Sequence, residues 1–205
     1  AKQLIREHGM PLAELEYCTA PLDWAVDGAD EVDASLALIK GGGGCLLQEK
    51  IVDTAANSLV IVCDEAKISR QFGERWLRAG FVPMAWALVK RQIETRFGGR
   101  AVLRESAGKM GPVVTDNGNF LIDWQFDAQQ KWEQVDRELH MMPGLVETGL
   151  FIGKASAVYV GKRRSRRCRD ADESVCRRPE AVGAVAAGRV GPGAQLQTGV
   201  GVAYF

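Results

Sequence analysis

Residues 36–63 follow the order strand, glycine loop, helix and strand, and this order restricts the fold more than any other feature of the sequence. The short apolar segment 36–39 runs into Lys40 and four consecutive glycines. Over residues 45–57, apolar side chains recur at every fourth position, which is typical of a helix. The run 59–63 (LVIVC) is continuous and largely β-branched, as expected of a buried parallel strand. The predicted fold class is therefore α/β.

Charged residues directly follow two of the predicted strands. The segment 22–26 is followed at once by Asp27, and the segment 59–63 by an acidic pair and then Lys67. In open α/β sheets, ligands bind beyond the carboxyl ends of the strands. We therefore expect Asp27 and Lys67 to face the same rim of the sheet.

The composition is that of an ordinary globular protein, with 205 residues of which 46% are hydrophobic and 25% charged. The formal net charge is zero, so no overall field favours a nucleic acid or a membrane surface as a partner. No apolar run is long enough to span a membrane, and the N-terminus lacks a signal-peptide pattern. The five cysteines show no CxxC pair and no zinc-type spacing with either histidine. They indicate reduced thiols, so we expect a cytoplasmic protein without a metal site.

Three familiar loop motifs do not fit the glycine run or the carboxylates before it. A phosphate-binding P-loop needs Lys and Ser or Thr after its last glycine, whereas Lys40 precedes the run and Cys45 follows it. The dinucleotide fingerprint needs a glycine where Leu46 stands. A calcium loop that starts at Asp27 has Val32 in place of its required glycine. These nucleotide and calcium sites are therefore excluded.

What remains is a glycine loop that enters a helix, where bare backbone N–H groups favour an anion. Lys40 stands at the entrance of the loop and Glu49 near the start of the helix. Glu49 is therefore a candidate general base, and Lys40 is a candidate for stabilising an oxyanion. In a simpler interpretation, Glu49 only complements the helix dipole and Lys40 is a solvated surface charge. The clustering of charges favours a site for a polar, phosphorylated small molecule.

The second half of the chain has a different pattern. Residues 85–97 predict an amphipathic helix that ends at a Gly-Gly pair, and residues 129–139 predict another. Between them, Asp116–Asn119 separates two β-prone runs, 112–115 and 120–124, which is a strong hairpin signal. A helix, a hairpin and a helix make a small α+β unit.

After Gly161 the composition changes abruptly. The basic run consists of Lys162, Arg163, Arg164, Arg166, Arg167 and Arg169. Such a run can bind phosphate backbones. A solvated, disordered tail is the interpretation that we prefer.

Five motifs carry a resemblance to a known family. In chain order they are DGADEVD (27–33), LIKGGGG (38–44), QEKI (48–51), TDNGN (115–119) and MPGLVETGLF (142–151). Together they closely resemble ribose-5-phosphate isomerase of the A type, with the eukaryotic members nearest. The resemblance runs from about residue 2 to about residue 161. Several ordered motifs are far more specific than any one of them.

The resemblance implies interconversion of D-ribose 5-phosphate and D-ribulose 5-phosphate through a cis-enediolate, in the non-oxidative pentose phosphate pathway. It implies no metal and no organic cofactor. The family's proton acceptor, the glutamate of the EK pair, falls on Glu49. By their chemistry, Lys40 suits stabilisation of the enediolate oxygen, while Asp27 and Asp30 can move protons and assist opening of the furanose ring. The implied substrate-binding residues are Asp27, Gly28, Ala29, Asp30, Lys40, Gly41, Gly42, Gly43 and Lys67.

The predicted fold is an open, Rossmann-like, mostly parallel sheet with helices on both faces, joined to a small α+β domain. Residues 1–80 form the larger domain, which residues 153–161 rejoin. Residues 81–152 form the small domain, and residues 162–205 form the arginine-rich, disordered tail. In this family, contacts between small domains usually support oligomers, so the resemblance implies a homodimer or a homotetramer.

Three departures from the family are expected to matter for activity. Upstream, the family's first strand and its Gly-Thr-Gly-Ser-Thr type loop, which contacts the substrate, are absent. The strand before residues 83–85 (PMA) is shorter than the resemblance implies, so we expect the edge of the small domain to suffer. The tail after Gly161 replaces the family's closing strand. Two alternative functions follow: a catalytically impaired isomerase that serves as an assembly subunit, and a phosphate or nucleic-acid binder through the tail.

Overall fold

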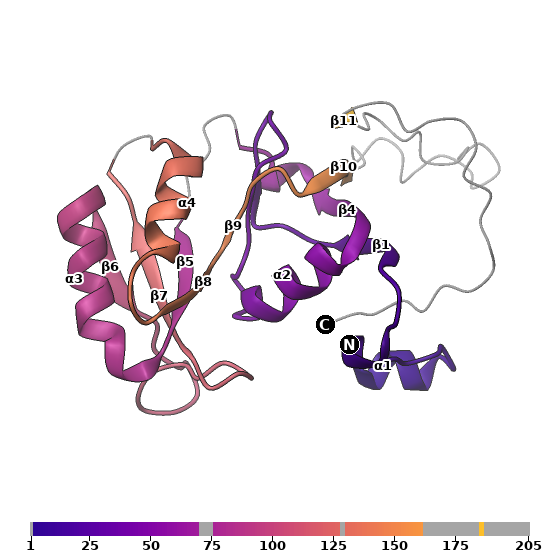
Figure 1. Cartoon of the computed structure of the whole chain (residues 1–205), viewed down its shortest axis with the longest axis horizontal. Coiled ribbons are helices and arrows are strands. Elements are labelled where there is room, and N and C mark those ends of the chain that lie inside the picture. Colours follow the sequence, from indigo (N-terminus) through magenta and orange to yellow (C-terminus); the bar gives the residue numbers. More distant parts are fainter. Residues whose placement is uncertain (1, 70–75, 128–129, 162–184, 187–205) are drawn as a thin grey trace, which may run out of the picture.

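The computed structural model describes residues 2–69, 76–127, 130–161 and 185–186 (Figure 1). A mainly parallel sheet of four strands, the larger sheet, lies at one end of the molecule. An antiparallel sheet of four strands that contains fewer residues, the smaller sheet, lies at the other end, with a short three-stranded sheet between them. Before the first strand come the helix α1 (Lys2–Glu7) and the 3-10 turn η1 (Leu15–Tyr17).

The larger sheet consists mainly of parallel strands, which confirms the α/β prediction. Its strand order is β1 (Leu22–Asp27), β4 (Ala56–Asp64), β10 (Ala155–Gly161) and β11 (Val185–Ala186). β1 and β10 run parallel to β4 on its two sides, and β11 pairs antiparallel with β10. Of the described helices, α2 (Leu46–Ala55) alone packs extensively on this sheet, against β1 and β4. Helices on both faces therefore stay a prediction.

Only two residues of the predicted tail, Val185 and Ala186, belong to the described part of the chain, where they form β11. The arginine-rich run lies outside the described residues. Its predicted disorder therefore stays a prediction.

The three-stranded sheet joins the two halves of the molecule. It consists of β2 (Glu31–Val32), β3 (Leu38–Ile39) and β9 (Leu150–Phe151). Successive side chains of a strand point to opposite faces. Accordingly, Leu38 and Phe151 pack into the core of the larger sheet, whereas Ile39 and Leu150 pack into that of the smaller one. Since both cores fix β3, the residue that follows it, Lys40, has a defined position between them.

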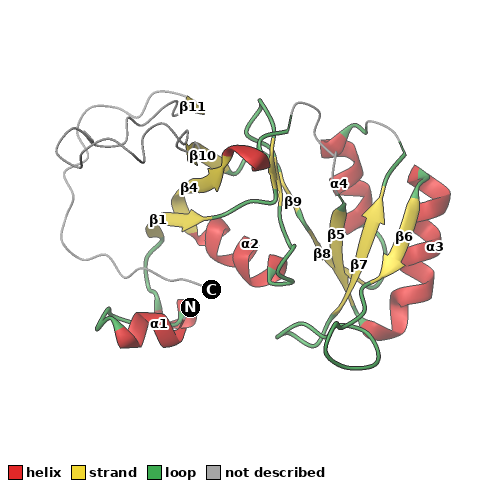
Figure 2. Cartoon of the chain, turned by 180° about the vertical axis from the view of Figure 1, so that it is seen from behind, coloured by secondary structure: helices red, strands yellow, loops and turns green. Residues whose placement is uncertain are grey.

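The smaller sheet is antiparallel and carries two helices on one face. Its strand order is β6 (Arg100–Leu103), β7 (Phe120–Gln125), β5 (Leu77–Phe81) and β8 (Leu145–Thr148). The helices α3 (Trp86–Phe97) and α4 (Trp132–His140) lie in front of this sheet in Figure 1 and behind it in Figure 2. They confirm the two helices predicted near 85–97 and 129–139. Val89 and Ile93 of α3 and Leu139 of α4 pack with Phe81 and Trp124 in one core.

The predicted hairpin is confirmed at its turn and wrong in its first arm. The turn closes through the Thr115 N–H and Gly118 N–H, which bond to the Asn119 and Thr115 carbonyls at 2.8 Å each. Residues 112–115 form only isolated bridges, because the Val113 N–H bonds back to the Arg104 carbonyl at 2.9 Å. The second arm, β7, pairs instead with β6 and β5.

The expectation of a weakened edge in the small domain is wrong, because the strand concerned lies inside the sheet. β5 pairs with β7 along its whole length, from Leu77 to Phe81, and with β8 on its other side. The 3-10 turn η3 (Pro83–Ala85) follows it. β5 also crosses the predicted boundary at residue 80, so we propose that the small domain begins before Leu77.

Candidate functional site

Eight of the nine predicted substrate-binding residues, together with the predicted base Glu49, line one open pocket of about 230 Å³. The residues are Asp27, Gly28, Ala29, Asp30, Lys40, Gly41, Gly42, Gly43 and Glu49. They come from the end of β1, the loop behind it, the glycine loop after β3, and the first turn of α2. The fold therefore brings together three segments that are separated along the chain.

Lys67, the ninth, is not among the residues that line this pocket. It closes the 3-10 turn η2 (Glu65–Lys67), directly after β4. Its place beyond the carboxyl end of a strand agrees with the prediction, but the described structure does not bring it to the pocket wall. Its role in binding stays a prediction.

Lys40 is the centre of the charge cluster in the pocket wall. It is 3% exposed, and its ammonium group donates to Gly28 O at 2.6 Å and lies 2.7 Å from Asp27 Oδ2. Glu49 Oε2 lies 3.3 Å away. Burial alone would lower the pKa of Lys40, but the carboxylates of Asp27 and Glu49 outweigh it and raise that pKa. Lys40 is thus a fixed, buried cation, and its interpretation as a solvated surface charge is wrong.

The backbone at Lys40 is held by the second glycine of the MPGLVETGLF motif, Gly149. The Lys40 N–H donates to Gly149 O at 2.9 Å, and the Gly149 N–H donates to Arg78 O at 2.7 Å. A Cβ atom at Gly149 would lie 2.3 Å from the Lys40 carbonyl oxygen. Only glycine allows the chain segment between β8 and β9 to approach Lys40 this closely.

Glu49 is half-buried in the first turn of α2, with its side chain 21% exposed. Burial raises the pKa of its carboxyl, Lys40 lowers it, and the charge of Asp27 raises it, with an upward net result. A carboxylate with a raised pKa is a better proton acceptor than a fully solvated one. When a base removes a proton from a neutral molecule, an anion is left, and the fixed cation of Lys40 beside Glu49 can stabilise that anion.

Gly41 and Gly42 of the glycine loop require glycine for different reasons. Gly41 has φ +97°, a left-handed conformation that disfavours any side chain. The Gly42 N–H donates to Asp30 Oδ2 at 2.7 Å, and a Cβ atom there would lie 2.7 Å from Asp30 Oδ1. A side chain at position 42 would therefore collide with the carboxylate of Asp30.

Sequence reasoning missed Asp53, a buried acid next to this cluster. Asp53 lies one turn after Glu49 on α2 and is 5% exposed. Burial first, and the charge of Asp27 second, raise the pKa of Asp53 to about 7. The protonated carboxyl can donate a hydrogen bond to Asp27. The four-residue spacing from Glu49 was the only signal in the sequence.

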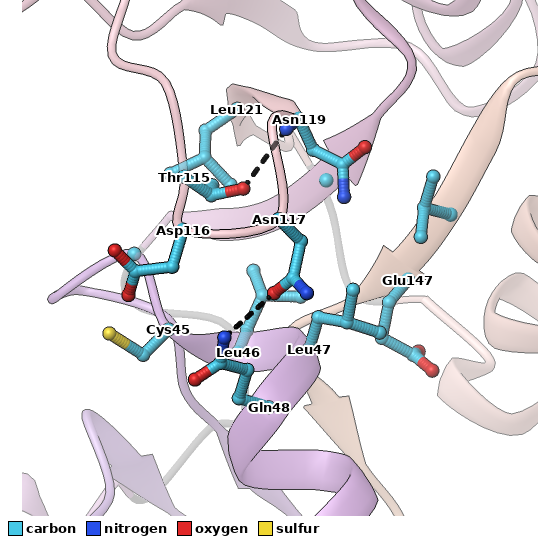
Figure 3. A pocket seen from close by; sticks show the side chains of 13 residues that line it. Cys45, Leu46, Leu47, Gln48, Thr115, Asp116, Asn117, Asn119, Leu121 and Glu147 are labelled. Carbon is cyan, nitrogen blue, oxygen red and sulfur yellow. Dashed lines mark hydrogen bonds between the residues drawn. The ribbon is translucent and has the colours of Figure 1, made fainter. Parts of the chain in front are cut away.

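The TDNGN turn supports α2 from the side of the small sheet (Figure 3). Gln48 Nε2 donates to Asn117 Oδ1 at 3.0 Å, and the Asn119 N–H donates to Thr115 Oγ1 at 3.1 Å. The cavity between this turn and the start of α2 has about 10 Å³, room for about one water molecule. This motif therefore buttresses the helix that carries Glu49, and the cavity is too small for a sugar phosphate.

The described part of the chain offers neither a cluster of metal ligands nor a membrane-spanning helix. Those residues contain no group of three or more His, Cys, Asp or Glu side chains that could hold a metal ion. None of the helices that they form has the length and apolar character needed to cross a membrane.

Known proteins are similar to this chain in sequence and in fold. The family described as Ribose 5-phosphate isomerase A (phosphoriboisomerase A) matches residues 1–165. The ribose-5-phosphate isomerase of Sus scrofa is 49% identical over 164 residues, covering 78% of this chain and 53% of that protein. The ribose-5-phosphate isomerase of Homo sapiens is 48% identical over 164 residues, covering 78% and 52%. The chain thus spans about half the length of these relatives.

A solved structure agrees with the sequence comparison. It is that of a D-ribose-5-phosphate isomerase in complex with phospho-erythronic acid, with a TM-score of 0.76 and 39% identity. The match covers 80% of this chain and 71% of that one. Since sequence and fold agree over nearly all of the described residues, the chain belongs to the ribose 5-phosphate isomerase A family.

Proposed function

We propose that the chain interconverts D-ribose 5-phosphate and D-ribulose 5-phosphate. The observation that carries this proposal is the Lys40 ammonium, which lies 2.7 Å from Asp27 and 3.3 Å from Glu49 in the wall of the pocket. A buried cation at this place can stabilise an oxyanion, and the carboxylate beside it can take a proton. Relatives that are 48–49% identical to this chain are ribose-5-phosphate isomerases, which supports the choice of substrate.

In the proposed reaction Glu49 moves one proton between two carbon atoms of the open-chain sugar. Its carboxylate takes the proton from C2 of the aldose, which leaves a cis-enediolate, and the resulting carboxylic acid returns that proton to C1. Such a positioned base is worth ~10²–10⁴-fold in rate. Lys40 stabilises the negative oxygen, and loss of one such stabiliser costs on the order of 10²–10³-fold.

The two aspartates serve the oxygen atoms of the substrate. Asp27 is oriented by Lys40 and by its bond from the Gly28 N–H at 2.6 Å. Asp30 is held by the Gly42 N–H. We propose that they move the proton between the two substrate oxygens and assist opening of the furanose ring. The structure of a family member with phospho-erythronic acid, a phosphorylated sugar acid, supports a phosphorylated ligand here.

The test is a coupled assay of ribose 5-phosphate isomerisation with the chain, Glu49→Gln and Glu133→Gln. Glu133 also lies in the first turn of a helix, but on the exposed surface of α4, so it controls for loss of a helix-dipole partner. We expect Glu49→Gln to reduce kcat at least ~10²-fold with little change in binding of phospho-erythronic acid. Glu133→Gln should behave as wild type. Turnover by Glu49→Gln at the wild-type rate would refute the assignment.

The same assay decides between the isomerase and an impaired assembly subunit, because the latter has no turnover. The alternative binder rests on the arginine-rich run, outside the described residues, and no described residue favours it.

We also propose a cytoplasmic homodimer or homotetramer. The support is the family membership, together with cysteines that show no disulfide-type spacing. Light scattering after size-exclusion chromatography tests the oligomeric state.

A further inference from the structure

A closed ring of polar contacts connects the pocket to the small sheet. It begins at Asp30, whose Oδ2 accepts the Gly42 N–H at 2.7 Å and lies 3.5 Å from Arg78 Nη1. Arg78 Nε lies 3.6 Å from Asp123 Oδ1. Asp123 in turn binds Arg104 in a fork, through Nε at 2.9 Å and through Nη2.

Arg104 closes the ring on the glycine loop. Its Nη1 donates to the carbonyls of Gly41 and Gly42 at 3.1 Å each. The side chains of Arg78, Arg104 and Asp123 are 16–23% exposed, so water competes only weakly for these contacts. The two arginines and the two aspartates balance each other in charge.

The small sheet carries this ring on the face away from its helices. Arg78 on β5 and Asp123 on β7 are register partners. Their neighbour Ile122 belongs to the helix-covered core, and Ala79, its register partner, is buried. Side chains of a strand alternate between faces, so Arg78 and Asp123 point toward the glycine loop. The Arg78 Cβ lies 3.2 Å from the place of a Cβ at Gly41.

By bonding to the Gly41 and Gly42 carbonyls, Arg104 also fixes the direction of the N–H groups of the same two peptides. In a trans peptide the C=O and the following N–H point in opposite directions. The Gly41 carbonyl faces Arg104, and the Gly42 N–H of the same peptide accordingly reaches Asp30. The Gly42 carbonyl also faces Arg104, so the Gly43 N–H points away from it. That N–H bonds to no described acceptor, and a side chain added at Gly43 would meet nothing within 4 Å.

We infer that Arg104 and Asp123 are positioning residues that aim the Gly43 N–H into the pocket as a donor for an oxygen of the substrate. Arg78, which lies between Asp123 and Asp30, positions the carboxylate of Asp30 in the same way. The small sheet thereby shapes the binding wall without touching the substrate. This inference rests on the proposed isomerase function and deepens it.

The experiment compares Arg104→Lys, Asp123→Asn and the double variant with wild type in the coupled assay. Lysine keeps the charge of Arg104 but cannot form the fork to Asp123 while bonding two carbonyls. We expect each single variant to lower kcat/KM by ~10–10²-fold, mainly through a higher KM, since misplaced donors weaken substrate binding. The double variant should lose little more than either single variant, because all three break one ring.

The matched control is Arg96→Lys, which alters an exposed pair with Glu138 at 3.9 Å in the same unit. It should leave KM unchanged, and melting temperatures of all variants show how much general stability contributes. A wild-type KM in both Arg104→Lys and Asp123→Asn would overturn the inference. So would losses in kcat/KM that simply follow the melting temperatures. An inactive wild type would instead refute the proposed function, so the two failures are distinguishable.

Discussion

Glu49 and Asp53 lie one helical turn apart on α2, and burial raises the pKa of both carboxyls above their ordinary values. The pKa of Asp53 is raised to about 7. Its Oδ2 is buried and has no hydrogen-bond partner among the described residues. Near neutral pH, α2 therefore holds an acid close to its titration midpoint next to the proposed base.

Because the pKa of Asp53 is raised in the folded state, we expect the free energy of unfolding to fall as the pH rises. A carboxyl whose pKa is raised on folding binds more protons in the folded state, so its contribution to stability falls between its ordinary pKa of 3.8 and about 7. Between pH 5 and pH 8 the loss should be on the order of 2 kcal/mol. Asp53→Asn, which cannot ionise, should lose less over this interval. Urea unfolding at both pH values measures the difference, and parallel pH profiles of the two proteins would exclude this role.

Gly149→Ala should destabilise the fold strongly, because its Cβ would meet the carbonyl oxygen of Lys40 at 2.3 Å. Backbone atoms held by both cores cannot move aside easily, so we expect a cost of ~1–3 kcal/mol or more. Gly108→Ala is the matched control, since its Cβ would meet nothing within 4 Å. Chemical denaturation gives both values. Equal stability of the two variants would show that the segment at Gly149 can relax.

His140 should stabilise the small unit at acid pH. Its Nε2 lies 2.8 Å from Glu147 Oε1, and this hydrogen bond is the largest cause of the raised pKa of His140. The contribution is therefore present below the ordinary pKa of 6.5 and is lost as the pH rises through the folded value. Because His140 is partly exposed, the effect should be only ~0.2–1 kcal/mol.

The measurement for His140 is the melting temperature of His140→Gln between pH 5 and pH 8.5. The deficit relative to wild type should be largest at pH 5 and shrink above pH 7. His8→Gln is the control, because the ring of His8, directly after α1, bonds to the Leu4 carbonyl of that helix and not to a carboxylate. A deficit that is independent of pH would mean that packing, and not charge, explains the effect.

The pocket could largely be predicted from the sequence, because its residues occur in short motifs at the ends of predicted elements. Asp27 is the last residue of β1, and Lys40 and Glu49 flank one glycine loop. Local order was sufficient to place these residues together. Lys67 shows the limit of this reasoning, since a position after a strand does not by itself place a side chain in the pocket wall.

The ring could not be predicted, because Arg78, Arg104 and Asp123 are far from the glycine loop in sequence and lie in none of the five motifs. Arg104 contacts Gly42 across 62 positions, and Asp123 lies on a strand whose pairing was assigned to the wrong neighbour. β5 was also missed as a central strand, since an arginine and a glycine interrupt its apolar pattern. The register of Arg78 with Asp123, together with the bonds from Arg104 to the glycine loop, shows that the small sheet reaches the pocket.

The central claim is that Glu49 carries the transferred proton, and exchange with solvent tests it most directly. The protein is incubated with ribose 5-phosphate in D2O, and deuterium on C1 and C2 of the sugar phosphates is followed by NMR spectroscopy. Wild type and Glu133→Gln should introduce solvent deuterium, whereas Glu49→Gln should do so at least ~10²-fold more slowly. Deuterium incorporation by Glu49→Gln at the wild-type rate would contradict the account.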